Sequence, residues 1–404
     1  MLHRLEIENF YAIRDVQVID LRVAHNVPDI PSRFAPVWKD AADRAPKVVA
    51  IFGPNASGKS TVLRALSFIA WFVRESFSVQ PDGRLPYERF NNQEAQSAPT
   101  RLGITLGGLA DPADESGEGP QCRYAYELEL GGPVGQNQIV LREAMYYWPK
   151  ESGRKVRLFE RDRQGKVHGG PDFGLAGYRQ ALDKVLRPNA SVISTLAQLK
   201  HPFATSIWES ARLVFSNILI ERSDGLEDQM VRFYAENPPL VEALNREIER
   251  IDLGIRAMRV EHGAHGPLLL FAHEGHDGPI PLVLESHGTR MFLRLYPFLL
   301  RALETGGIAV MDELDTAIHP LVLPEILRWF HDPARNPREA QLWMTCHNAS
   351  LLEELVKEEI LFTTKASNGR AAVYPLTDIQ AVRRDDNYYR KYLSGTYGAV
   401  PRIG

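Results

Sequence analysis

The chain has 404 residues, a formal net charge of −4, 44% hydrophobic residues and 24% charged residues. The length exceeds one typical domain and the composition is that of an ordinary soluble globular protein, so we expect two closely joined lobes. The net charge excludes a protein that is basic over its whole surface but leaves room for a local basic patch. The two cysteines, Cys122 and Cys346, exclude a disulfide-stapled secreted fold and favour a reducing compartment.

The N-terminal sequence MLHRLEIENF carries charges where a signal peptide needs an apolar segment. The stretch nearest to a membrane span, Ala65–Val73, is too short to cross a bilayer. We therefore expect a cytoplasmic protein without a membrane segment.

The first part of the chain reads as strands followed by one helix. Apolar alternation over 2–22 predicts two strands joined near Asn9–Phe10, and residues 23–46 read as a loop or insertion. The apolar run KVVAIF at 47–52 predicts a buried strand. A helix with apolar residues at helical spacing is expected from Lys59 to about Glu75.

The middle of the chain changes character twice. Residues 76–177 contain short alternating segments separated by Gly, Pro, Asp and Ser, which predicts an antiparallel β layer with a surface loop at 107–120. Residues 178–252 switch to helical periodicity, which predicts an inserted helical lobe. Residues 256–284 predict a β-hairpin with its turn at 274–279.

The last third returns to alternating helices and strands. An apolar strand is expected at 308–311, after a helix over 289–303. The further expected elements are a helix at 320–330, a strand at 341–345, a helix at 350–357 and strands at 360–364 and 371–375. The sequence shows no internal repeat and no heptad run long enough for a coiled-coil arm.

The segment Gly53-Pro54-Asn55-Ala56-Ser57-Gly58-Lys59-Ser60, followed by Thr61, matches the phosphate-binding pattern G-x-x-x-x-G-K-[ST] between an expected strand and an expected helix. The glycines let successive backbone N–H groups face phosphate oxygens, and the helix adds the positive end of its dipole. Lys59 supplies a cation for the β- and γ-phosphates, and the Ser60 hydroxyl is a ligand for Mg²⁺. We therefore expect ATP and Mg²⁺ as cofactors.

Asp312 and Glu313 end the apolar strand expected at 308–311. A strand with this ending places one carboxylate at a metal and the other where a water can be polarised. We expect Asp312 to hold Mg²⁺ through water and Glu313 to be the general base. Taken alone, acids at a strand end are often only a solvated terminus, and it is the phosphate-binding loop that favours the functional interpretation.

The phosphate-binding loop and the carboxylate pair lie far apart in the sequence, whereas a compact GTPase or a simple nucleotide kinase places its second motif much sooner. The sequence therefore predicts an α/β P-loop NTPase interrupted by a large insertion. We place the N-terminal half of the ATPase domain, including the β layer, at 1–177 and the helical lobe at 178–255. The C-terminal half follows at 256–377, and a charged, aromatic tail occupies 378–404.

Five features recur in the same order in ABC-class ATPases of the SMC, RecF and OLD type. They are the strand pair ending near Asn9–Phe10, the loop at 53–60, Ser286-His287-Gly288-Thr289, the strand end MDELD at 311–315 and Thr345-Cys346-His347-Asn348. Within that class the chain resembles the compact AAA-type ATPases of prokaryotic phage-defence and abortive-infection systems, of the OLD-like, AbiL and Rlo types. Its ending, YLSGTYGAVPRI, is similar to the tail of that group.

The resemblance implies further site residues. Ser286 and Gly288 resemble the ABC signature, which reaches the γ-phosphate bound by a second subunit, although Ser286 or Thr289 would also serve as a plain helix cap. His347 resembles the switch histidine that contacts the γ-phosphate, and the alternative is a histidine in an ordinary turn.

Other positions carry weaker indications. Asp315 and His319 correspond to the D-loop that crosses the interface of ABC-class dimers, although Asp315 also fits a helix cap. Gln93 is a candidate for the glutamine that senses the metal, with a plain loop as its alternative. The histidines His262, His265, His273 and His276 form two H-x-x-H pairs, but without a nearby cysteine we set a zinc site aside.

The resemblance implies an ATP-hydrolysing switch that forms homodimers or higher oligomers through shared nucleotide sites. Such a switch controls a partner effector, a nuclease or toxin, in antiviral defence. The segment after His347 is too short for the Toprim nuclease domain of OLD proteins. One alternative is a RecF-like DNA-repair ATPase, so that nucleic acid stays a candidate partner. Another alternative is a non-enzymatic scaffold whose bound nucleotide only stabilises the fold. Glu313 argues against this alternative, because a protein that only binds the nucleotide needs no general base there.

Overall fold

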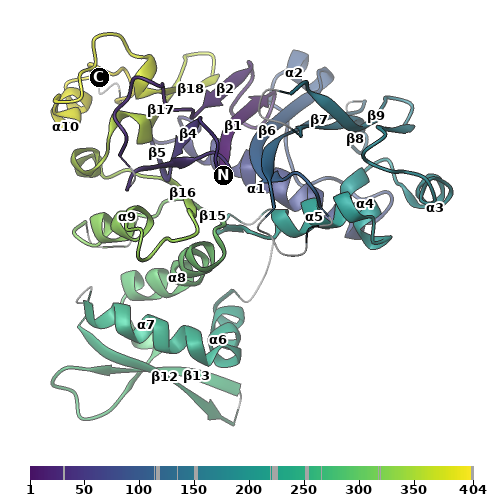
Figure 1. Ribbon diagram of the computed structural model, residues 1–404. Coiled ribbons are helices and arrows are strands. Elements are labelled where there is room, and N and C mark those ends of the chain that lie inside the picture. The colour runs from purple at the N-terminus through teal and green to yellow at the C-terminus, as the bar shows by residue number, and fades with distance from the viewer. Residues whose placement is uncertain are drawn as a thin grey trace.

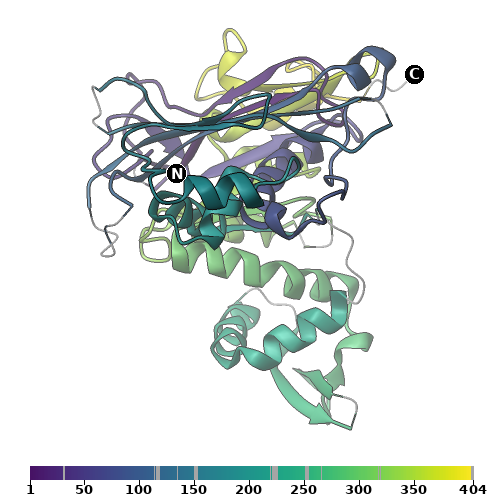
Figure 2. The same cartoon turned by 90° about the vertical axis from the view of Figure 1, so that its right-hand side faces the viewer.

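The computed structural model describes residues 1–30, 32–112, 114, 119–133, 135–149, 153–218, 220, 226–250, 254–264, 266–316, 318 and 320–401. Two sheets lie beside each other in the upper part of Figure 1, and a smaller lobe lies below them. The long helix α8 (His287–Thr305) separates that lobe from the upper part (Figure 2).

A mostly parallel sheet forms the first large part. Within the described residues its strand order is β11-β15-β16-β5-β17-β18, and β17 and β18 alone pair antiparallel. The strands are β5 (Val48–Phe52), β11 (Val214–Ser216), β15 (Ile308–Met311), β16 (Gln341–Thr345), β17 (Ile360–Lys365) and β18 (Ala371–Pro375). Every residue of β5 and β16 is buried, as expected for parallel strands covered on both faces.

Helices cover both faces of this sheet. The helix α1 (Lys59–Glu75) packs on the face to which Val49 of β5 points. The opposite face, to which Val48 points, is covered by α8 and by α9 (Leu323–His331). Two separate cores result because successive residues of a strand point to opposite faces.

The second large part is an antiparallel sheet with the strand order β10-β9-β8-β7-β6-β1-β2 in the part of the chain that the structure describes. Its strands are β1 (Leu2–Glu8), β2 (Gln17–Asp20), β6 (Thr100–Leu109), β7 (Gln121–Gly131), β8 (Ile139–Trp148), β9 (Val156–Arg161) and β10 (Val167–Gly169). One face packs on α1, α3 (Arg179–Val185), α4 (Val192–Gln198) and α5 (Pro202–Ala211). Figure 2 shows this sheet edge-on above these helices.

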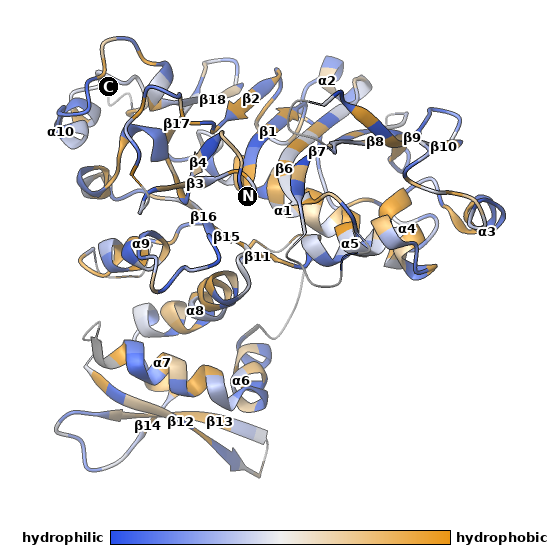
Figure 3. Ribbon diagram, in the orientation of Figure 1, coloured by the Kyte–Doolittle hydropathy of each residue, from blue (hydrophilic) through white to orange (hydrophobic). Residues whose placement is uncertain are grey.

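The smaller lobe consists of α6 (Leu226–Glu236), α7 (Pro238–Arg250) and the strands β12 (Ile255–Gly263), β13 (Gly266–His273) and β14 (Ile280–Pro281). Asn245 of α7 accepts a hydrogen bond from the Met258 N–H at 2.7 Å and donates one to the Met258 carbonyl at 3.0 Å, which fixes α7 on β12. Figure 3 shows apolar and polar residues mixed along α7 and α8, as expected for helices with one buried face.

The remaining elements are short. They are β3 (Phe34–Pro36), β4 (Arg44–Pro46), α2 (Gln93–Ser97), α10 (Tyr388–Leu393) and the 3₁₀ helices η1 (Ser76–Ser78), η2 (Leu282–Leu284), η3 (Ala349–Glu354), η4 (Lys357–Glu359) and η5 (Leu376–Asp378). None of the helices that the structure describes combines the length and the apolar character needed to cross a bilayer.

The structure differs from the expected elements at several places. Residues 23–46 contain the small hairpin β3–β4. The turn expected at 274–279 joins β13 to β14, and a further strand, β12, precedes β13. The helix expected at 350–357 is the 3₁₀ helix η3. The loop expected at 107–120 begins later, because Gly107–Leu109 continue β6, and residues 113 and 115–118 lie outside the described residues.

The helical lobe expected at 178–255 is divided by β11. This strand joins the parallel sheet beside β15, so α3–α5 lie on the antiparallel sheet and α6–α7 lie in the smaller lobe. A strand of three residues is too short to show its own alternation in the sequence, and only its pairing with β15 defines it.

Candidate functional site

The loop between β5 and α1 is shaped by its glycines and by β17. Gly53 and Gly58 have φ of 151° and 104°, a conformation that residues with a Cβ rarely adopt. A Cβ at Gly53 would lie 2.4 Å from the Thr363 carbonyl oxygen, so the loop backbone touches β17. The hydroxyls of Ser57 and Thr363, 2.6 Å apart, fix this contact.

Lys59 turns its ammonium group into this loop. Its Nζ donates to the carbonyl oxygens of Gly53 at 2.8 Å and Pro54 at 3.0 Å. Burial lowers the pKa of Lys59, and the nearby carboxylate of Asp312 opposes this shift. Both hydrogen-bond acceptors found for Nζ among the described residues are neutral oxygens, so an anionic phosphate matches the charge that the loop encloses.

Asp312 is held by side chains from three separate segments of the chain. Its Oδ1 accepts hydrogen bonds from Ser60 Oγ of α1 at 3.0 Å and from Thr345 Oγ1 of β16 at 2.7 Å. Its backbone N–H donates to Asn217 Oδ1 at 2.8 Å, and Asn217 Nδ2 donates to the Asp312 carbonyl at 2.9 Å. The carboxylate therefore lies beside the Ser60 hydroxyl, and the two groups supply the oxygen ligands that Mg²⁺ prefers.

Asn217 continues the sheet where β11 ends. Its backbone N–H donates to the Val310 carbonyl at 3.2 Å, and its side-chain amide then pairs with both backbone groups of Asp312. The side-chain amide thus makes two hydrogen bonds to Asp312 at the point where the backbone of a longer β11 would continue to pair with β15. This fixes the backbone at the end of β15.

Glu313 follows in a left-handed backbone conformation with φ of 52°. Its N–H donates to Thr345 Oγ1 at 2.7 Å, so the threonine hydroxyl bridges the backbone of Glu313 and the carboxylate of Asp312. The Glu313 side chain lies at the wall of a cavity that Lys59 and His347 also line. A carboxylate in this position can take a proton from a water inside the cavity.

Asp315 joins the segments after β15 and β16. Its Oδ2 accepts from the backbone N–H groups of His347 at 2.7 Å and Asn348 at 2.6 Å. The N-cap residue of α9 is Val322, so the carboxylate of Asp315 holds the His347 turn and does not cap that helix.

The cavity that contains these groups has a volume of about 910 Å³, within the range of about 300–1,000 Å³ common for ligand sites. It is lined by Tyr11, Ala12, Asn55, Ala56, Gly58, Lys59, Ser60, Thr61, Glu88, Arg89, Asn91, Glu313, Asp315, Thr316, His347 and Lys365. Tyr11 and Ala12 lie between β1 and β2, so the antiparallel layer supplies one wall.

The structure brings most of the expected site residues together. Asn55, Ala56, Gly58, Lys59, Ser60, Thr61, Glu313, Asp315 and His347 line the cavity, and Asp312 adjoins it through Ser60. Gly53, Pro54 and Ser57 shape the loop from behind. Gln93 begins α2 and is absent from the lining, which holds Asn91 instead.

Ser286 and Gly288 are not among the residues that line this cavity. Ser286 is the N-cap of α8, where its Oγ accepts from the Thr289 N–H at 3.1 Å, and its side chain is exposed. The capping role considered from the sequence is therefore present. His319, the other D-loop candidate, lies outside the described residues.

The histidine cluster is only partly described, because His265 lies outside the described residues. Within the described part of the chain, no group of three or more His, Cys, Asp or Glu side chains is arranged to hold a metal ion. His273 contacts Glu285 through its Nε2 at 2.6 Å.

Sequence reasoning missed several contributors to the site. Asn217, Asn91, Tyr11 and Lys365 stand in no recognisable motif. Tyr11 and Asn91 lie next to positions that the sequence did single out, at Asn9–Phe10 and at Gln93. For Asn217 there was no signal, because the neighbouring strand β11 has only three residues.

The comparisons with known proteins give one family match. Residues 48–353 match the model of a family described as "AAA domain, putative AbiEii toxin, Type IV TA system". No curated protein matches the chain.

Among solved structures, the chain is similar to an SMC head domain from Thermotoga maritima, with 15% identity over 93% of this chain and 98% of that chain and a TM-score of 0.38. It is also similar to an Smc head bound to the C-terminal winged-helix domain of ScpA, with 11% identity, 92% and 97% coverage and a TM-score of 0.46. A third is an Smc head with an extended coiled coil bound to the C-terminal domain of ScpA, from Pyrococcus furiosus, with 12% identity, 92% and 95% coverage and a TM-score of 0.41.

The strand order and the positions of the motifs confirm the expected fold class. The phosphate-binding loop follows β5, the carboxylate pair follows β15, and the His347 turn follows β16, all at the carboxyl ends of parallel strands. The fold is an α/β P-loop NTPase of the ABC-ATPase type with an antiparallel β layer.

Proposed function

The chain belongs to the AAA-domain family that its residues 48–353 match, and from this premise we propose that it is an ATP-hydrolysing switch. ATP assembles two or more copies, and the assembly controls a separate effector protein. The observation that carries the proposal is that Lys59, Ser60, Glu313 and His347 line one cavity, with Asp312 beside it on Ser60.

The roles of these residues follow from their positions. Mg²⁺, when bound, supplies positive charge to the phosphates, and Ser60 and Asp312 would hold it. Lys59 binds the β- and γ-phosphates from inside the loop. Glu313 accepts a proton from the attacking water, and His347 contacts the γ-phosphate from the turn held by Asp315.

The distribution of the site residues supports assembly of two copies. Glu313 and His347 lie at the cavity wall, and the His347 side chain is exposed, so this end of the site is open to solvent in one chain. The exposed Ser286 and the segment to Gly288 lie outside that chain's own cavity. We infer that they complete the cavity of a second copy, where the N-terminus of α8 suits an anion.

The class of partner is the second part of the proposal. The family description calls the domain a putative toxin of a type IV toxin–antitoxin system. The separate nuclease or toxin effector and its place in antiviral defence are proposed from the resemblance of the motifs to phage-defence ATPases. The alternative is a RecF-like ATPase that acts directly on DNA. It predicts that DNA stimulates hydrolysis, whereas the effector model predicts that DNA alone leaves the rate unchanged.

Trans-complementation tests the shared site. Ser286→Arg places bulk at the inferred contact while its own loop at 53–60 stays intact, so this variant should bind ATP but neither assemble nor hydrolyse it. A mixture with Lys59→Ala chains contains one complete composite site in each mixed pair. Hydrolysis should then partly recover, unless turnover needs both sites together.

Assembly measured by size-exclusion chromatography with and without ATP is the deciding readout, and Gly288→Arg is the matched variant. Because Ser286 caps α8, Ser286→Arg also loses a cap worth about 1 kcal/mol, whereas Gly288→Arg keeps that cap. If both variants assemble on ATP like the unmodified chain, the segment is only a helix cap and the shared-site model is wrong.

A further inference from the structure

A second cavity, of about 1190 Å³, lies apart from the nucleotide site. It is bounded by α1, α5, β11, α6 and α8, where the smaller lobe faces the two sheets. Its volume exceeds the range of about 300–1,000 Å³ common for small-molecule sites. A segment of polypeptide fits this size better than a metabolite does.

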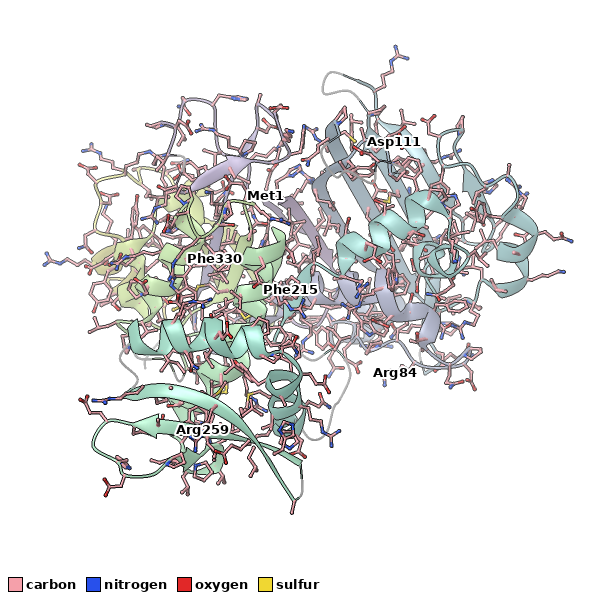
Figure 4. The ribbon with its side chains drawn as sticks, turned by 60° about the horizontal axis from the view of Figure 1, so that its bottom comes forward. Met1, Arg84, Asp111, Phe215, Arg259 and Phe330 are labelled. Atoms are coloured by element: carbon pink, nitrogen blue, oxygen red, sulfur yellow. The ribbon has the colours of Figure 1, made fainter. Side chains whose placement is uncertain are left out.

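The floor of this cavity is apolar and aromatic. Trp71 of α1, Phe215 of β11, Met230 of α6 and Phe298 of α8 all line it. Figure 4 labels Phe215 near the middle of the molecule, with Arg259 far out on the smaller lobe. Apolar side chains from three helices and one strand are the usual lining of a groove that accepts an amphipathic helix.

The α8 wall carries two arginines, Arg294 and Arg301. They are seven residues apart, which places them on one face of the helix about 10 Å from each other. Among the described residues neither forms an ion pair. Arg294 contacts the Met291 sulfur at 4.0 Å, and the Arg301 guanidinium lies 5.9 Å from the centre of the Phe233 ring.

On the wall formed by α1 and the end of α5, the arginines already have acidic partners. Arg74 pairs with Glu75 at 2.6 Å, and Arg212 pairs with Glu209 at 3.2 Å. Among the described lining residues, the arginines without an acidic partner are therefore the two on α8. A nucleic acid strand needs cations along its whole backbone, whereas a helix with two acidic residues two turns apart matches the α8 wall.

We propose that this cavity is the docking groove for an acidic amphipathic helix of a partner protein. Its apolar face covers Trp71, Phe215 and Phe298, and its carboxylates pair with Arg294 and Arg301. The inference rests on the proposed function, because a switch that controls a separate effector needs a surface on which that effector docks.

The floor of the groove leads directly to the nucleotide site. Asn217 lines the groove and, through its side-chain amide, holds both backbone groups of Asp312. Ser216, also on the floor, bonds Ser67 of α1 at 2.8 Å. A helix that presses on β11 therefore changes the position of Asp312, so occupancy of the groove changes the rate of ATP hydrolysis.

Selection from a displayed library of short random peptides on the full chain tests the groove, because such a library samples acidic amphipathic helices of many sequences at once. The selected peptides are then measured against Arg294→Glu/Arg301→Glu and against Arg256→Glu/Arg259→Glu. The second pair reverses two exposed arginines on β12, outside the groove. Thermal unfolding of each variant establishes that both are folded.

We expect selected peptides with an amphipathic pattern and acidic residues two turns apart. They should bind the α8 variant, Arg294→Glu/Arg301→Glu, at least about tenfold more weakly than the unmodified chain. They should bind the β12 variant, Arg256→Glu/Arg259→Glu, as tightly as the unmodified chain. They should also change the rate at which the unmodified chain hydrolyses ATP. Selection of no peptide, or of peptides that bind both variants equally, overturns the proposal. If the unmodified chain binds oligo-dT and the α8 variant loses this binding while the β12 variant keeps it, the groove binds nucleic acid. That result also overturns the proposal.

The peptide binding is measured without ATP, which separates this proposal from the proposed function. A chain that binds the selected peptides through α8 but never hydrolyses ATP contradicts the ATPase switch and leaves the groove standing. A chain that hydrolyses ATP but binds no such peptide contradicts the groove alone.

Discussion

The two large sheets use polar side chains in different ways. At the carboxyl edge of the parallel sheet, Ser60, Asn217 and Thr345 all reach Asp312, at distances of 2.7 to 3.0 Å. On the antiparallel sheet the charged pairs are spread over one face. Arg163 and Glu129, at 2.6 Å, are one such pair.

The topology of each sheet explains the difference. All carboxyl ends of parallel strands meet at one edge, so polar residues that follow different strands converge on one point. In an antiparallel sheet successive strands end at opposite edges, so charged residues do not converge on one edge. On this sheet they form chains of ion pairs along one face, such as Glu8–Arg101–Glu129–Arg163, and each exposed pair is worth about 0–1 kcal/mol. Substitutions at the carboxyl edge of the parallel sheet should therefore change ATP binding or hydrolysis. Substitutions on the charged face of the antiparallel sheet should hardly change the free energy of unfolding.

The largest effect is expected for Lys59→Ala. The loop then loses the buried cation that faces the phosphates, so ATP binding should be abolished. Isothermal titration calorimetry with Mg²⁺ and ATP measures this directly. Tight nucleotide binding by the variant would show that the loop at 53–60 is not the phosphate site.

Glu313→Gln should keep ATP binding and lower turnover by about 10²–10⁴-fold, the range for removal of a general base. The ATP-bound assembly should also accumulate, because the slow hydrolysis no longer allows it to dissociate. Steady-state phosphate release and size-exclusion chromatography provide the two readouts. Near-normal hydrolysis by the purified variant would place the base elsewhere.

A change in pH tests the antiparallel sheet through His3 of β1. Burial lowers the pKa of His3 from its ordinary value of 6.5 to about 4, so between these values the unfolded chain binds a proton that the folded chain does not. Stability should therefore fall as the pH drops from 6.5 to about 4, by about 3 kcal/mol from this group. Urea unfolding of His3→Gln across this range should show a correspondingly weaker dependence, and an equal dependence would contradict the assignment.

Asn217→Ala removes the two hydrogen bonds that hold the backbone of Asp312. We expect kcat to fall about tenfold while the affinity for ATP stays unchanged, because the loop at 53–60 is intact. Asn217→Asp can still accept from the Asp312 N–H but cannot donate to its carbonyl, so its rate should be intermediate. Equal rates for all three chains would make Asn217 a purely structural residue.

The smallest effect is expected on the antiparallel face. Arg163→Ala removes an exposed partner of Glu129, and we expect the unfolding temperature to shift by less than about 2 °C with no change in ATP hydrolysis. Differential scanning calorimetry provides the test. Glu129 also pairs with Arg101, and a shift several times larger would mean that these linked pairs stabilise one another by more than their separate values.

The sequence alone determined the parts of the site that lie within short contiguous motifs. The glycine-rich loop, the carboxylates of Asp312 and Glu313, and His347 each stand beside a strand whose apolar run is visible in the sequence. Such motifs are readable because one short stretch of backbone builds the chemical unit. The order of these strands along the chain also indicated the fold class.

Only the tertiary structure decided which distant residues support those motifs. Asn217 reaches Asp312 because the three-residue strand β11 pairs with β15, and Tyr11 lines the cavity because the turn after β1 lies against the loop at 53–60. The groove beside α8 likewise exists only where α1, α6 and β11 meet. These contacts join residues far apart in the chain, and neither periodicity nor spacing records such pairings, because they arise from packing.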